Sequence, residues 1–102
     1  MLDKATVREI AHKYAEEVIK VLNPEQIILF GSYVNGTPWE HSDIAIVMNG
    51  YKGKKLATTS ILYALTEPVS FDIEPHLLDE TRDRSGFLEF VKETGEVIYQ
   101  AT

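Results

Sequence analysis

The hydrophobic pattern of the chain begins with an amphipathic segment between about residues 3 and 22. Apolar residues recur there at spacings of three and four, the pattern of a helix with one buried face. The residues on that face are Val7, Ile10, Ala11, Tyr14, Val18 and Val21. Asn23-Pro24 is expected to end the helix, because the residue before a proline is pushed out of helical geometry.

Short apolar runs in the rest of the chain predict β-strands, because they are rich in β-branched and aromatic residues. These runs cover residues 26–30, 43–48, 69–74 and, more weakly, 96–99. The second run leads into Asn49-Gly50, a turn-forming pair. Pro75 is expected to interrupt the third run, because proline lacks the N–H that a strand donates.

Two further helices are predicted between these strands. Apolar spacing favours a helix over residues 54–65 that is stopped by Pro68, and a last helix over residues 85–93 that ends at Gly95. A short helical turn is expected at 32–36. The order of these elements predicts an α/β or α+β fold, in which a small mixed β-sheet is flanked by helices.

Composition narrows the class of protein. A length of 102 residues favours a single domain over 1–102, and 44% hydrophobic with 25% charged residues is typical of a soluble globular protein. The absence of cysteine excludes disulfides, thiolate metal sites and cysteine nucleophiles. The N-terminal residues are charged and no apolar run is long enough for a signal peptide or a membrane span. We therefore expect no membrane association and a cytoplasmic location.

The formal net charge of −6 bears on the choice of partners. It argues against general nucleic-acid binding, because a nucleic-acid surface needs basic residues to neutralise phosphates. It permits the binding of a single nucleotide, since a metal ion can supply the local positive charge. It also suits a basic partner protein, and it leaves a homo-oligomer open.

A phosphate-binding turn is one interpretation of Gly31-Ser32, which directly follows the first strand. Glycine lets the backbone approach a ligand closely, and the free N–H groups at the start of a helical turn favour an anion. Ser32 adds a hydroxyl donor. The segment is not a Walker A loop, because Gly36 is followed by Thr37-Pro38 instead of lysine and a hydroxyl residue. A plain strand-to-helix turn capped by Ser32 is the alternative.

Two aspartates in the predicted strands are candidate metal ligands. Asp43 opens the second strand, and strand alternation places it on the same face as Ala45. Asp72 is expected within the third strand, where it shares a face with Glu74. Carboxylates on two strands suit a hard cation such as Mg²⁺, which prefers oxygen ligands. The alternative is that both aspartates are solvent-facing residues near strand ends.

The spacing of these residues resembles the signature of the polymerase-β nucleotidyltransferase superfamily. That signature is Gly-Ser, ten residues and Asp-x-Asp at the head of a strand, with a third aspartate one or two elements later. Gly31-Ser32, the ten residues 33–42 and Asp43 match it without a gap, and Asp72 stands where the third carboxylate is expected. The length is similar to that of the small stand-alone members, which are often paired with a helical HEPN-type partner in toxin–antitoxin operons. The resemblance implies a nucleotidyltransferase-like fold.

The resemblance also implies roles for these residues. Gly31 and Ser32 would hold the β and γ phosphates of a nucleoside triphosphate, expected to be ATP. Asp43 would be a metal ligand, and Asp72 would bind the catalytic metal and help to activate the nucleophile. The family uses two Mg²⁺ ions. The implied reaction transfers AMP to a hydroxyl acceptor, which in the related antitoxins is a tyrosine of the partner toxin.

The chain departs from the signature at Ala45, where the family has its second strand aspartate. Loss of this ligand is expected to leave fewer bound ions and an impaired reaction. Three explanations of the alanine compete: natural degeneration, an introduced inactivating substitution, and partial compensation by Glu74. The sequence leaves two main functions open: an impaired nucleotidyltransferase, or an inactive nucleotide-binding or partner-binding module that acts as an antitoxin or regulatory subunit. A small domain with an accidental motif is a third reading.

Overall fold

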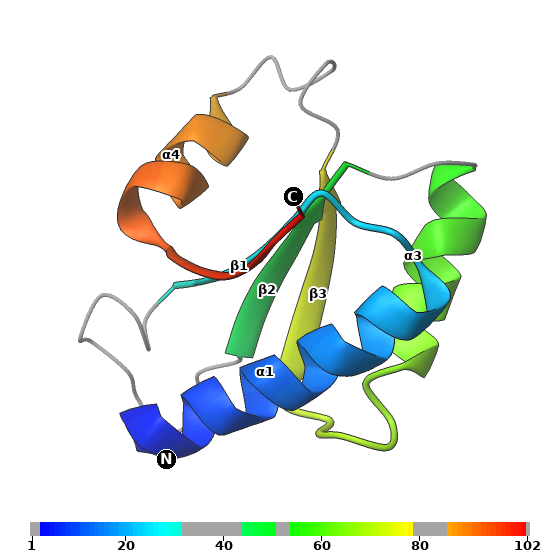
Figure 1. The fold of residues 1–102 in the computed structure, drawn as a ribbon, viewed down its shortest axis with the longest axis horizontal. Helices are drawn as coiled ribbons and strands as arrows, with labels where there is room; N and C mark the ends of the chain where they lie inside the picture. Colours follow the sequence, from blue (N-terminus) through cyan, green and yellow to red (C-terminus); the bar gives the residue numbers. More distant parts are fainter. Residues whose placement is uncertain (1–2, 32–43, 51–53, 79–85, 102) are drawn as a thin grey trace.

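The computed structural model of the protein describes residues 3–31, 44–50, 54–78 and 86–101. The helices and strands in these ranges are α1 (Lys4–Val21), β1 (Gln26–Phe30), β2 (Ile44–Asn49), α3 (Lys55–Ala64), β3 (Ile73–Leu78), α4 (Phe87–Thr94) and β4 (Glu96–Gln100). The strands form one sheet, with α1 and α3 on one face and α4 on the other (Figure 1). The predicted fold, a small mixed sheet flanked by helices, is confirmed.

The strand order in the sheet is β3-β2-β1-β4. β1 runs antiparallel to both β2 and β4, whereas β2 and β3 are parallel. The parallel pair is connected through α3, because parallel neighbours need a crossover on one face of the sheet. This topology brings the end of β1 beside the starts of β2 and β3.

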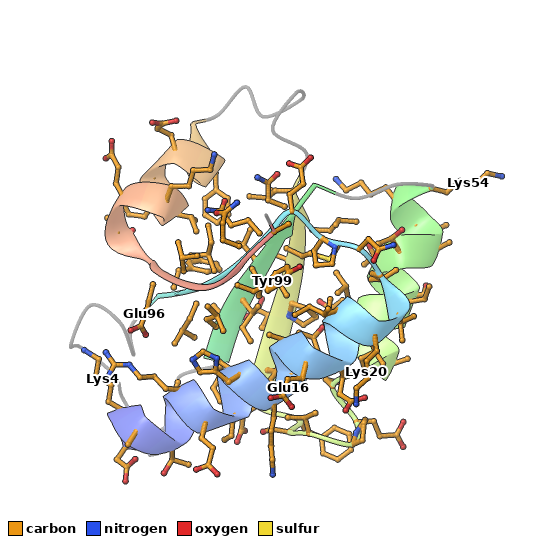
Figure 2. The ribbon with its side chains drawn as sticks, viewed as in Figure 1. Lys4, Glu16, Lys20, Lys54, Glu96 and Tyr99 are labelled. Carbon is orange, nitrogen blue, oxygen red and sulfur yellow. The ribbon has the colours of Figure 1, made fainter. Side chains whose placement is uncertain are left out.

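The first helix is defined by its cap and by its buried face. The side chain of Asp3 accepts a hydrogen bond from the backbone N–H of Thr6 at 2.7 Å, and this bond lowers the pKa of Asp3. The buried residues of α1 are Val7, Ala11, Tyr14, Ala15 and Val18. Glu16 and Lys20, labelled in Figure 2, are exposed. The helix therefore covers the sheet with one apolar face, as its residue spacing predicts. The prediction is wrong for Val21, which is 56% exposed at the last residue of the helix.

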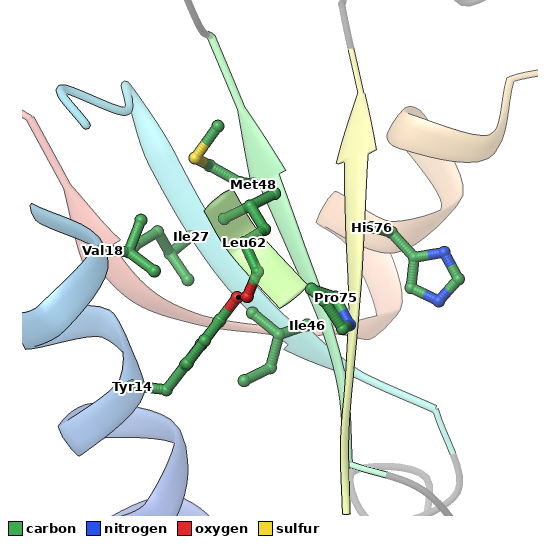
Figure 3. A pocket seen from close by; sticks show the side chains of 8 residues that line it. All are labelled: Tyr14, Val18, Ile27, Ile46, Met48, Leu62, Pro75 and His76. Carbon is green, nitrogen blue, oxygen red and sulfur yellow. Dashed lines mark hydrogen bonds between the residues drawn. The ribbon is translucent and has the colours of Figure 1, made fainter. Parts of the chain in front are cut away.

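The main core lies between the sheet and the helices α1 and α3. Ile27, Ile46, Met48 and Leu62 each have at most 2% of their surface exposed there. The hydroxyl of Tyr14 donates a hydrogen bond to the backbone carbonyl of Leu62 at 2.7 Å, which ties α1 to α3. Burial raises the pKa of Tyr14. The small pocket that remains is lined mainly by apolar side chains (Figure 3).

A smaller core covers the other face of the sheet, beneath α4. Ile28, Val47 and Val91 are buried in it, and partly buried apolar side chains surround them. The chain passes close to β1 after α4, since a Cβ on Gly95 would lie 2.6 Å from the Ile28 side chain. Glycine therefore permits the tight approach of α4 to the sheet, and the prediction that it ends the helix is confirmed.

The third strand lies four residues later than the sequence pattern predicts. Residues 65–69 form a turn, in which the N–H groups of Val69 and Ser70 donate to the carbonyl of Thr66 at 3.0 and 2.8 Å. Pro75 does not interrupt the strand, because it lies inside β3. β3 is an edge strand of this sheet, and proline is tolerated there since one side of the strand needs no N–H donor.

The other elements match their predicted positions to within about two residues, a normal uncertainty for element boundaries. α4 begins at Phe87 after Gly86, which has a left-handed φ of 76°, and the predicted cap at Ser85 lies outside the described residues. The predicted helical turn at 32–36 also lies outside them. Within the described ranges, none of the helices has the length and apolar character needed to span a membrane.

Candidate functional site

The turn after β1 begins with Gly31 in a conformation that favours glycine. Its φ is 93°, a left-handed value that strains a residue with a side chain. A Cβ placed on Gly31 would lie 3.6 Å from the Cβ of Ala45, an ordinary van der Waals distance. The conformation, and not a lack of space, therefore favours glycine. The same distance shows that Gly31, the predicted phosphate-binding residue, and Ala45, where the chain departs from the family signature, are direct neighbours.

Position 45 lies in a row of side chains that crosses three strands. Phe30 of β1 is paired with Ala45 of β2, and Ala45 is paired with Glu74 of β3. The neighbours Ile44 and Ile73 are buried in the core beneath α1 and α3. Because strand residues alternate between faces, the row faces the α4 side of the sheet. Glu74 is therefore the residue of β3 directly beside Ala45.

Asp72 lies immediately before β3, in a turn, and not within the strand as predicted. Its side chain is exposed, while its backbone is fixed on both sides. The carbonyl of Asp72 accepts a hydrogen bond from the N–H of Ile44 at 2.8 Å, and the N–H of Asp72 donates to the Ser70 hydroxyl at 3.1 Å. The backbone of Asp72 is thus bonded to the first residue of β2.

Ser32 and Asp43 lie outside the described residues, so their predicted convergence with Gly31 and Asp72 stays a prediction. Among the described residues, no three histidine, aspartate or glutamate side chains form a group that could hold a metal ion. The donor chemistry nevertheless fits a hard divalent cation, because Asp72 and Glu74 present exposed carboxylates at the start of β3. Gly31, beside Ala45, has no side chain to keep a phosphate away from its backbone.

His76 is a residue of this face that the sequence pattern does not reveal. Its Nε2 lies 3.6 Å from Oε1 of Glu74. Its ring makes edge contacts with Phe30 and Phe87, with centroids 5.5 and 6.5 Å apart, and points away from the apolar pocket (Figure 3). The signal in the sequence is the alternation Glu74, Pro75, His76, which places the two polar residues on one face. This alternation is not apparent when the strand is predicted at 69–74, because His76 then lies outside the strand.

The family model described as Polymerase beta, Nucleotidyltransferase matches residues 9–102. A search of curated proteins gave no match.

Several solved structures share the fold. A protein from Sulfolobus solfataricus assigned as a nucleotidyltransferase has 24% identity and a TM-score of 0.66, with 95% of this chain and 83% of that chain covered. The toxin–antitoxin MntA-HpeT appears as two mutants. The first, with two Asp-to-Glu changes, has 22% identity and a TM-score of 0.61, with 99% of this chain and 76% of that chain covered. The second, with a Tyr-to-Ala change, has 23% identity and a TM-score of 0.60, with 100% and 76% covered.

Proposed function

Since this chain belongs to the polymerase beta nucleotidyltransferase family, we propose that it binds a nucleoside triphosphate at the turn after β1 and is a nucleotidyltransferase weakened at Ala45. The family resemblance of the sequence is thereby confirmed, whereas the substrate and the reaction are proposals. ATP is the proposed triphosphate. The observation that carries the proposal is the contact between position 31, with its left-handed backbone, and position 45 of β2.

The proposed roles are those that the family resemblance implies. Gly31 and Ser32 bind the β and γ phosphates, and Asp43 and Asp72 would hold Mg²⁺. When bound, Mg²⁺ neutralises phosphate charge and orients the triphosphate. The oxygen of an acceptor hydroxyl forms a bond to the α-phosphorus, the bond from that phosphorus to the bridging oxygen of the β-phosphate breaks, and pyrophosphate leaves. The hydroxyl proton passes to the carboxylate of Asp72, and AMP remains on the acceptor.

Ala45 limits this reaction, because a methyl group replaces a carboxylate beside the phosphate-binding turn. A displacement of reacting groups by about 1 Å costs on the order of 100-fold in rate. We therefore expect slow transfer with nucleotide binding retained.

A second candidate function is a binding module that acts as an antitoxin or regulatory subunit without transfer. Ala45 favours it directly, and two structural neighbours are toxin–antitoxin MntA-HpeT mutants. The proposed partner is a basic, helical, HEPN-type protein, which suits the net charge of −6. Leu56 and Phe71, each 82% exposed, supply apolar surface for such a contact or for a second copy of the chain.

The experiment compares the wild type with Ala45→Asp, using ATP labelled at the α-phosphate, Mg²⁺ and the candidate partner. ATP affinity is measured in parallel. Ala57→Asp is the matched control, because it adds the same carboxylate at an exposed position of α3. We expect weak label transfer by the wild type, strong transfer by Ala45→Asp and no gain in the control. Transfer by Ala45→Asp alone would show that the present chain is a binding module or an inactivated enzyme, and a lack of both ATP binding and transfer in every variant would overturn the proposal.

A further inference from the structure

We infer that Glu74 supplies the metal-binding carboxylate that position 45 lacks, and that His76 positions it. This inference rests on the proposed function, since it assigns a further ligand to the same nucleotide site. One of the metal-binding carboxylates expected for the family would then come from β3 instead of the adjacent strand β2.

The register of the sheet is the first argument. Ala45 and Glu74 are paired across the parallel strands β2 and β3 and lie on the same face. Neighbouring strands are about 4.8 Å apart, a distance that a glutamate side chain can span. Glutamate has one methylene group more than aspartate, and Ala45 extends only a methyl group from β2. The carboxylate of Glu74 can therefore approach the place that an aspartate at position 45 would occupy.

The accessibility of Glu74 is the second argument. Its side chain is 48% exposed, so a cation can reach the carboxylate without rearrangement of the core. In the described part of the chain, its ion-pair contact is with His76, between Oε1 and Nε2 at 3.6 Å. Oε2 is the carboxylate oxygen not engaged in that contact. An exposed carboxylate oxygen outside this contact is suited to bind a hard cation.

The ring contacts of His76 are the third argument. The ring lies between β1 and α4, with its centroid 5.5 Å from that of Phe30 and 6.5 Å from that of Phe87. The two phenylalanine rings also contact each other edge to face at 5.6 Å. These contacts restrict the imidazole, and the imidazole in turn restricts the direction of the Glu74 carboxylate. His76 is thus a positioning residue that touches neither metal nor nucleotide.

The test uses the full chain, ATP and Mn²⁺, with free Mn²⁺ measured by electron paramagnetic resonance. We expect Glu74→Gln to weaken Mn²⁺ binding by at least about tenfold, because perturbing residues that support a metal site already costs 10–100-fold. Glu16→Gln is the control, since Glu16 is an exposed carboxylate on α1, across the sheet (Figure 2). ATP affinity without metal is expected to stay unchanged in Glu16→Gln.

The decisive variant is the double substitution Ala45→Asp with Glu74→Gln. If the two carboxylates serve the same place, Ala45→Asp restores Mn²⁺ binding in the Glu74→Gln background, and the two changes are strongly non-additive. His76→Leu is expected to weaken Mn²⁺ binding about tenfold, whereas His76→Gln retains a side-chain donor and most of the affinity. Equal thermal midpoints of the two His76 variants exclude a merely structural effect.

The outcomes separate this inference from the proposed function. If the wild type binds ATP and Mn²⁺ and Glu74→Gln matches Glu16→Gln, the role of Glu74 is overturned and the nucleotide site stands. The same conclusion holds if Glu74→Gln weakens Mn²⁺ binding but the added Ala45→Asp change does not restore it. If the wild type binds neither ATP nor Mn²⁺, both proposals are overturned.

Discussion

The two faces of the sheet differ in what their side chains do. The face beneath α1 and α3 is a continuous apolar core, in which the buried hydroxyl of Tyr14 donates a hydrogen bond to the backbone carbonyl of Leu62. Among the described residues, the face beneath α4 has three fully buried apolar residues in its cluster, and it carries the row through Ala45 and Glu74. The packing that stabilises the fold therefore lies mainly on the first face, and Ala45 and Glu74, which we propose to border the nucleotide site, lie on the second.

This difference explains how a signature residue can be lost without loss of the fold. Position 45 is only partly buried and contacts the turn at Gly31, whereas its neighbours Ile44 and Ile46 are buried in the main core. A change at position 45 alters the site and leaves the packing of β2 on α1 and α3 intact.

The largest expected effect comes from the main core. Leu62→Ala removes a side chain that is 1% exposed, and we expect a loss of about 2–5 kcal/mol in the free energy of unfolding. Urea titration measures this loss. ATP affinity of the folded protein should remain that of the wild type. A folded Leu62→Ala variant that no longer binds ATP would show that the two faces are not separate.

Next in size is Gly31→Ala, which forces alanine into a left-handed conformation with φ of 93°. We expect a loss of about 1–2 kcal/mol in stability, together with loss of ATP binding. Gly86→Ala is the matched control, since Gly86 has φ of 76° and open space around its Cβ position. Both variants should lose similar stability. Equal ATP affinity in the two variants would remove Gly31 from the site.

The next prediction concerns Tyr14→Phe and the pH dependence of the free energy of unfolding, which tests the core beneath α1 and α3. Because the folded state raises the pKa of Tyr14, it retains the phenol proton more tightly than the unfolded chain does. The stabilisation is present below the unfolded pKa of about 10 and is lost as the pH rises above it. We expect Tyr14→Phe to lose about 1 kcal/mol at neutral pH through the missing bond to Leu62. Unfolding curves from pH 7 to 11 should show a shallower alkaline decline in the variant, and identical slopes would contradict this account.

The smallest effect is expected at the surface pair between α1 and β4. Arg8 Nε lies 3.0 Å from Glu96 Oε2, and the two side chains are 48% and 39% exposed. Arg8→Ala should change the free energy of unfolding by less than about 1 kcal/mol, because solvent and salt screen such pairs. Thermal unfolding at low and high salt measures the change. A larger, salt-independent loss would indicate that the Arg8 side chain, near the start of α1, packs against the main core.

The same contrast governs what the sequence could predict. The main core and most elements follow from periodicity, because one buried face imposes a regular apolar pattern on α1 and β1. The third strand was misplaced because Val69 is apolar yet lies in a turn, while Pro75 is tolerated by an edge strand. The spacing alone predicts Gly31 as a site residue and marks position 45 as the departure from the family signature. The pairing of Ala45 with Glu74 and the contact of Glu74 with His76 depend on register, which no local pattern determines.

The most direct test of the central claim is a nuclear magnetic resonance titration of the ¹⁵N-labelled chain with ATP and a trace of Mn²⁺. The paramagnetic ion broadens signals of amides close to it. We predict selective broadening at Gly31, Ala45 and Glu74, with Thr58 and Leu62 on α3 unaffected. Broadening centred on α3, or none at the Gly31–Ala45 contact, would contradict a nucleotide site on the α4 face of the sheet.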